Sequence, residues 1–217
     1  MIALPTPSDG RRQDDGGRPG GARQDDGPRH SHRRRDAPPA RDGHRPDELL
    51  LAGGACLRVR RLAPSDRERL AAFFERLSDQ SRHRRFLGPK PRLSAAELTY
   101  LTEIDHVSHE ALAAIDDRDG SIVGVSRYAR WRDREDVAEM AVAVADDLQG
   151  RGVGTALTRR IVDRASANGI ARLTASTFWD NAAARALLRR LGFRVLDGGA
   201  VLDFYLDLPA TGARACA

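Results

Sequence analysis

The stretch Gln149-Gly150-Arg151-Gly152-Val153-Gly154 decides the fold of this chain. It lies between an apolar segment, residues 137–145, typical of a buried strand, and a segment from residue 152 whose apolar residues repeat with helical spacing. Glycines permit a tight turn and remove the Cβ atoms that keep a ligand away from the backbone. The first N–H groups of a helix lack partners and carry the positive end of its dipole, so the stretch predicts a phosphate-binding loop.

A tight connection that binds nothing is the alternative interpretation of this loop. A dinucleotide-binding turn fits less well, because the third glycine of that fingerprint stands one residue later than Gly154 does. The segment after the loop and its helix helps to identify the kind of loop. Residues 171–177 predict a strand, and residues 180–193 predict a helix. Asp180 or Asn181 can cap the start of this helix, and Gly192 can end it.

Together these two motifs resemble the GNAT superfamily of acyl-CoA-dependent N-acyltransferases. Gln149-x-x-Gly152-x-Gly154 is similar to its pyrophosphate loop, and residues 180–193 are similar to its next helix. The resemblance implies an α/β fold with a mixed sheet over residues 56–209 and acetyl-CoA as co-substrate, without a metal. It also implies which residues bind the cofactor: the backbone of Val142, Ala143 and Val144 at the pantetheine arm, Gln149, Gly150, Arg151, Gly152, Val153, Gly154 and Thr155 at the pyrophosphate, and Asn181 at the arm.

Glu139 is the candidate general base. It interrupts an otherwise apolar strand, where a carboxylate is costly to bury unless it has a partner or a task. An edge glutamate that faces water or pairs with an arginine is the alternative. The family resemblance implies catalysis, because many GNAT enzymes hold a glutamate at the start of this strand.

One position departs from the family pattern. Leu188 stands where many members have a tyrosine that protonates the leaving thiolate. Tyr128 and Tyr205 are the available substitutes, although packing within strands explains both residues more simply.

The acceptor is predicted from an upstream segment. Residues 77–87 and 103–112 are similar to the catalytic domain of bacterial Pat-type protein lysine acetyltransferases, which implies a protein substrate such as an acyl-CoA synthetase. A small-molecule amine acetyltransferase and a non-catalytic acyl-CoA sensor remain as alternatives. We expect Arg82, Arg84 and Arg85 to form a solvated face or to pair with acids. His106 and His109 are close enough for a metal site, but no further ligand cluster stands nearby.

Composition divides the chain into unlike parts. Residues 1–55 are rich in Arg, Asp, Gly and Pro and predict a disordered tail, and residues 210–217 predict a flexible end. The tail is nearly neutral, with ten arginines against nine acidic residues. The net charge of +5 for the whole chain is therefore weak support for nucleic-acid binding. Neither a signal peptide nor a membrane-spanning stretch stands out, which makes the cytoplasm the expected location and a membrane partner unexpected.

The remaining elements follow from hydrophobic periodicity. A helix is expected to start at residues 64–66 and another at Ser94. Further strands are expected over residues 57–62, 110–116, 122–130, 136–145 and 202–208.

Overall fold

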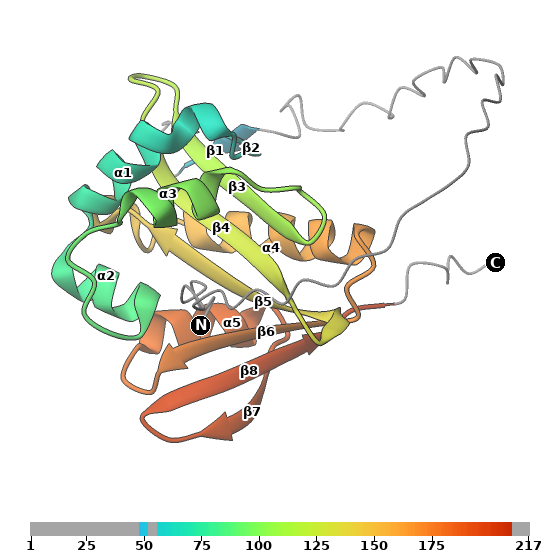
Figure 1. The fold of residues 1–217 in the computed structure, drawn as a ribbon. Helices are drawn as coiled ribbons and strands as arrows, with labels where there is room; N and C mark the ends of the chain where they lie inside the picture. The colour runs from blue at the N-terminus through green and yellow to red at the C-terminus, as the bar shows by residue number, and fades with distance from the viewer. Residues whose placement is uncertain (1–47, 52–55, 210–217) are drawn as a thin grey trace, which may run out of the picture. The chain divides into compact units, whose positions relative to one another are not determined.

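This computed structural model describes residues 48–51 and 56–209. Their strands form one eight-stranded sheet (Figure 1). The strand order is β1-β2-β3-β4-β5-β6-β8-β7, and each neighbouring pair is antiparallel except β5 and β6. The elements are, in chain order, β1 (Glu48–Leu50), β2 (Cys56–Arg61), the 3-10 turn η1 (Pro64–Asp66), α1 (Arg67–Arg76), α2 (Asp79–Phe86), α3 (Ala95–Thr102), β3 (His109–Asp116), β4 (Ile122–Trp131), β5 (Arg134–Val144), the 3-10 turn η2 (Asp146–Leu148), α4 (Val153–Ala167), β6 (Arg172–Phe178), α5 (Ala182–Arg190), β7 (Arg194–Gly198) and β8 (Val201–Asp207).

Helices cover both faces of the sheet. Side chains alternate between the two faces along β4. Ser126 points toward α4, where its hydroxyl donates a hydrogen bond to the carbonyl of Leu157 over 3.1 Å. Arg127, the next residue, points toward the opposite face, where its guanidinium donates to the carbonyl of Leu101 at the end of α3 over 3.3 Å. Figure 1 shows the same arrangement, with α1 and α3 on one side of the central strands and α4 on the other.

The core lies in these two layers. Leu157 and Ile161 of α4 and Leu57 of β2 are almost completely buried, as is Phe204 of β8. None of the helices in the described part of the chain has the length and hydrophobicity that a membrane crossing requires.

Two of the helices begin where the sequence supplies a cap. Ser94 accepts a hydrogen bond from the Glu97 backbone N–H at 3.2 Å, and the Glu97 carboxylate accepts from the Ser94 N–H at 2.8 Å. This reciprocal pair fixes the start of α3, as predicted. Ser78 accepts from the backbone N–H of Ser81 and caps α2 through this single hydrogen bond.

Three elements differ from the sequence prediction. Strand β1 (Glu48–Leu50) falls within the predicted tail, where it pairs with β2 because a short leucine run supplies apolar side chains. The rest of that tail, residues 1–47 and 52–55, and the predicted flexible end at 210–217 lie outside the described residues. Helix α2 (Asp79–Phe86) escapes a periodicity test because its only apolar residue is Phe86. Strand β7 (Arg194–Gly198) is short and lies at the sheet edge, paired with β8 alone.

Candidate functional site

A slot opens between β5 and β6. The two parallel strands pair through only three positions, the last of which joins Glu139 to Thr174. Beyond this position β5 continues to Val144 and β6 to Phe178, but the two strands no longer pair with each other. The backbone N–H and C=O groups along this edge of β5, apart from the Val144 carbonyl that accepts from Gln149, are therefore available to a ligand.

The glycine-rich loop closes one end of this slot. Gly150 and Gly152 have φ angles of +75° and +90°, a region that side chains with a Cβ rarely adopt, so the turn requires glycine at both positions. None of the backbone N–H groups of residues 150–155 donates a hydrogen bond to another described residue. Helix α4 begins here, so these donors combine with the positive end of its dipole into a site for an anion.

The slot and the loop form one cleft with about 1760 Å³ of space, including space open to solvent. Because the cleft runs from the slot to the loop, its shape suits an extended ligand with a diphosphate group at one end. Most of the predicted cofactor residues line the cleft: Val142, Ala143, Val144, Gln149, Gly150, Gly152, Gly154, Thr155 and Asn181.

Two predicted cofactor residues contribute differently. The Val153 side chain is completely buried in the core, so only its backbone N–H can contact a ligand. Arg151 is exposed and is not among the lining residues. Asn181 caps α5, as the sequence suggested, and its contact with the cofactor's arm stays a prediction. Its side-chain oxygen accepts from the Ala184 N–H at 3.2 Å and caps α5, while the residue also lines the cleft.

Glu139 lies at the closed end of the slot. It belongs to the last paired position, one residue before Met140, where the lining of the cleft begins. By strand alternation its side chain shares a face with Ala141 and Ala143, the face that α1 and α3 cover. The strand from Glu139 to Val144 spans roughly 17 Å, comparable to the length of a pantetheine arm.

No tyrosine is among the residues that line the cleft. Leu188 lines it and is buried. Tyr128 is fully buried on the α4 side, where its hydroxyl donates to the Val107 carbonyl over 3.0 Å and accepts from the Asn168 amide over 2.6 Å. Tyr205 lies on β8 beneath the Arg172 guanidinium, 4.8 Å from its ring centroid. Both tyrosines are therefore packed strand residues.

Helix α2 forms the wall opposite β5. It is tied to the loop through Asp146, whose carboxylate accepts from the backbone N–H and hydroxyl of Ser78 at 2.8 and 2.9 Å and from the Ser81 hydroxyl at 2.6 Å. Gln149 donates from its amide to Ser81 and to the Val144 carbonyl at 3.2 and 3.1 Å. Burial alone would raise the pKa of the Asp146 carboxyl, but the hydrogen bonds from Ser81 and Ser78 outweigh it and lower that pKa. The charged carboxylate thus holds the two walls together.

The arginines of α2 differ in their surroundings. Arg82 does pair with an acid, because its guanidinium lies 2.5 Å from Asp79. Arg84 and Arg85 line the cleft. Ser81 and Leu77 also line the cleft and were not predicted. Ser78, which caps α2, is the local sequence signal for the start of this helix.

The two histidines upstream have protein partners. His106 Nδ1 lies 2.6 Å from the buried carboxylate of Glu110, and His109 Nε2 lies 3.2 Å from the Arg127 guanidinium. Burial, followed by the charge of Arg127, lowers the pKa of His109 to about 3, so its imidazole is neutral at physiological pH. The described residues contain no group of three or more His, Cys, Asp or Glu side chains arranged to hold a metal ion.

Comparison with known proteins gives one consistent result. The model of the acetyltransferase (GNAT) family matches residues 70–193. The GNAT domain of the Pat protein from S. lividans is 32% identical, and the match covers 74% of this chain and 96% of that domain with a TM-score of 0.69. A cAMP-binding acyltransferase from Mycobacterium smegmatis is 27% identical, with a TM-score of 0.54, over 76% of this chain and 48% of that protein.

Two more relatives extend the comparison. An acetyltransferase from Pseudomonas aeruginosa is 42% identical over 81 residues, which are 36% of this chain and 44% of that protein. The match thus spans less than half the length of this curated relative. The yncA protein of Salmonella typhimurium, solved with its cofactor acetyl-CoA, is 21% identical over 74% of this chain and 99% of its own, and its TM-score of 0.57 reflects a shared fold.

Proposed function

This chain belongs to the GNAT family of acetyltransferases, and we propose that it transfers the acetyl group of acetyl-CoA to the side-chain amine of a protein lysine. The slot between β5 and β6, ending at the unpaired N–H groups of residues 150–155, is the observation that carries the proposal. The choice of a protein acceptor follows from the resemblance of residues 77–87 and 103–112 to Pat-type protein lysine acetyltransferases. We expect the reaction to take place in the cytoplasm.

In this proposal the cofactor is held mainly by main-chain groups. The diphosphate of coenzyme A accepts hydrogen bonds from the N–H groups at the start of α4. The amides of the pantetheine arm pair with the free edge of β5, in place of the hydrogen bonds that β6 does not make. The sulfur end of the arm then points toward Glu139.

The chemical step needs a neutral amine. A lysine amine with a pKa near 10.4 is neutral in only about one molecule in a thousand at physiological pH. We assign Glu139 as the base that takes the proton, directly or through a water molecule. The neutral amine nitrogen then attacks the thioester carbon, the N–C bond forms, the C–S bond breaks, the thiolate of coenzyme A leaves, and the second proton of the nitrogen passes to water.

The leaving thiolate needs no tyrosine in this scheme. Leu188 presents only hydrocarbon to the cleft. A thiol has a pKa near 8.5, so the thiolate is a fair leaving group and can take its proton from water after departure.

The proposal is tested by incubating the purified protein with acetyl-CoA and two panels of acceptors, lysine peptides and small amines. We expect acetylated lysine peptides by mass spectrometry and release of free thiol at the same rate. Acetylation confined to the amine panel would replace the protein acceptor with a small molecule. Binding of acetyl-CoA without transfer to either panel would identify an acyl-CoA sensor.

A further inference from the structure

A second, smaller hollow lies beneath α2 and meets the cofactor cleft. The two share Leu77, Arg85 and Ala143 as lining residues. Apart from Arg85 and Arg127, the lining of the smaller hollow consists of Leu, Phe, Val and Ala side chains from the first three helices, the segments that join them and the sheet. It is therefore a mainly apolar extension of the cleft.

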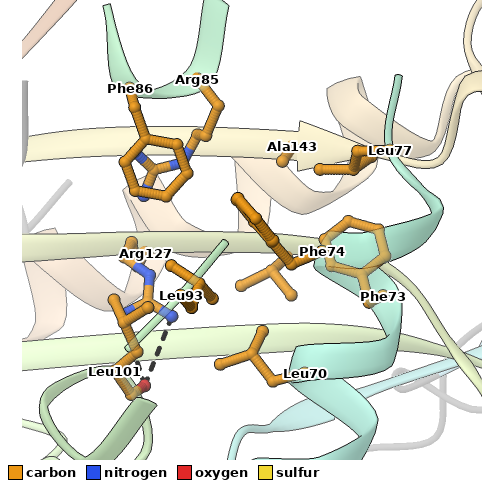
Figure 2. A pocket seen from close by; sticks show the side chains of 11 residues that line it. Leu70, Phe73, Phe74, Leu77, Arg85, Phe86, Leu93, Leu101, Arg127 and Ala143 are labelled. Carbon is orange, nitrogen blue, oxygen red and sulfur yellow. Dashed lines mark hydrogen bonds between the residues drawn. The ribbon is translucent and has the colours of Figure 1, made fainter. Parts of the chain in front are cut away.

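Side chains of the protein already fill this hollow almost completely. Phe74 of α1 and Phe86 of α2 pack edge to face, with their ring centroids 5.6 Å apart, and Phe74 is only 4% exposed. Figure 2 shows the Phe74 ring in the middle of the hollow, with Leu77 and Ala143 above it. The cavity that remains has a volume of about 30 Å³. That is room for about one water molecule.

Leu77 lies where the hollow meets the cleft. Its side chain is buried and belongs to the lining of both. The backbone is fixed on either side of it, because the Leu77 N–H donates to the Phe74 carbonyl at 3.2 Å and the Ser78 N–H donates to the Asp146 carboxylate at 2.8 Å. The leucine is therefore held in place between the cleft and the hollow.

An acyl chain longer than acetyl would need the space that these side chains occupy. In the proposed function the thioester lies beside Ala143, the residue of β5 at which the hollow meets the cleft. A propionyl or butyryl group adds one or two methylene groups to the acetyl group, and apolar carbons favour the apolar side of a cleft over water. On that side they would overlap with packed side chains, which is unfavourable.

We propose that Leu77 determines the length of the acyl group and restricts the donor to acetyl-CoA. The inference rests on the proposed acyl transfer and names its donor. Leu77 acts by filling the space beside Ala143, with the Phe74 ring behind it. The bonds made and broken are those of the acyl transfer described above.

Donors that differ only in the length of the acyl chain test this assignment. The dissociation constants of acetyl-, propionyl- and butyryl-CoA are measured by calorimetric titration, and kcat/KM is measured for each donor with one acceptor. We expect kcat/KM of the wild-type protein to fall by roughly 10- to 200-fold from acetyl-CoA to butyryl-CoA, with weaker binding of the longer donor. Equal values for the three donors would overturn the inference.

The variant Leu77→Ala opens the hollow to the cleft. An apolar cavity lined by Leu and Phe side chains accepts an apolar group in preference to water, so the ratio of kcat/KM between acetyl-CoA and butyryl-CoA should shrink by roughly tenfold or more. Leu62→Ala is the matched control. It truncates a completely buried leucine outside both hollows, so it should cost comparable stability and keep the wild-type ratio.

Leu77→Val repeats the comparison with a smaller loss of volume, for the case that Leu77→Ala does not fold. We expect a shift of the donor ratio in the same direction, by roughly threefold or more. The inference is overturned if the ratio in the Leu77 variants equals the ratio in Leu62→Ala. Failure to bind any of the three donors would instead refute the proposed function.

Discussion

Gly154→Ala should separate cofactor binding from stability. Gly154 lies in the first turn of α4 and, unlike Gly150 and Gly152, does not have a positive φ angle. A Cβ at this position would lie 3.6 Å from Val144 and 3.7 Å from Leu187, both ordinary van der Waals distances. The folded protein therefore accepts the methyl group, and the lower entropy of the unfolded chain should raise the free energy of unfolding by about 0.4–1 kcal/mol.

The same methyl group occupies space that the cofactor needs. Gly154, Val144 and Leu187 all line the cleft, so the added carbon projects into it. Steric overlap of this kind costs about 1–3 kcal/mol. We expect the dissociation constant of coenzyme A to rise by roughly 5- to 150-fold. Calorimetric titration measures this change, and urea denaturation measures the stability.

Gly124→Ala is the matched control, because the same change there should have the opposite effect. A Cβ at Gly124 would lie 2.9 Å from the Leu157 side chain and 3.4 Å from the Ala143 carbonyl, inside the core. We expect a loss of about 1–3 kcal/mol of stability and a small change in coenzyme A affinity. Wild-type affinity in Gly154→Ala would show that the cofactor does not approach this part of the loop, and the reasoning would be refuted.

Three further measurements address the site and its support. Glu139→Gln should lower kcat by roughly two to four orders of magnitude at neutral pH, with little change in acetyl-CoA affinity, and unchanged turnover would remove Glu139 from the chemical step. Asp146→Ala removes the hydrogen-bond acceptor that joins α2 to the loop. Amide hydrogen exchange in α2 should therefore accelerate by roughly tenfold or more. Unchanged protection would mean that packing alone holds the helix. The hydrogen bond from Arg60 lowers the pKa of the buried Asp66 carboxyl from 3.8 to about 2. The stabilisation by the charged carboxylate is present above about pH 4 and is lost as the pH falls through about 2. Between about pH 6 and pH 2 the free energy of unfolding of the wild-type protein, measured by urea denaturation, should therefore fall by about 2 kcal/mol more than that of Asp66→Asn. Equal losses in the two proteins would contradict this assignment.

Local signals in the sequence predicted the elements around the cofactor. Positive φ angles, as at Gly150 and Gly152, strongly favour glycine, and a helix cap such as Asn181 favours a few small polar residue types. The sequence alone therefore locates the loop and the start of α5. The hairpin of β3 and β4 was equally readable, because a polar turn separates two apolar runs.

Features that depend on tertiary contacts were not predictable in this way. Helix α2 has a single apolar residue, and its position comes from the hydrogen bonds of Asp146, 60 and more residues away in the chain. Arg82, Arg84 and Arg85 look alike in sequence, and only the packing of α2 over the sheet shows that Arg84 and Arg85 line the cleft while Arg82 pairs with Asp79. Strand β1 was missed because three residues are too few for a periodicity.

The early parting of β5 and β6 has a consequence for how sequences in this fold can diverge. Along the open edge of β5 the protein offers a ladder of main-chain donors and acceptors that any residue type supplies equally. Substitutions that preserve the path of the chain therefore leave this ladder intact. The side chains that contact the amine substrate can change independently of it. A domain that shares only 32% of its residues with this chain can accordingly keep the same path of the main chain, as its TM-score of 0.69 shows.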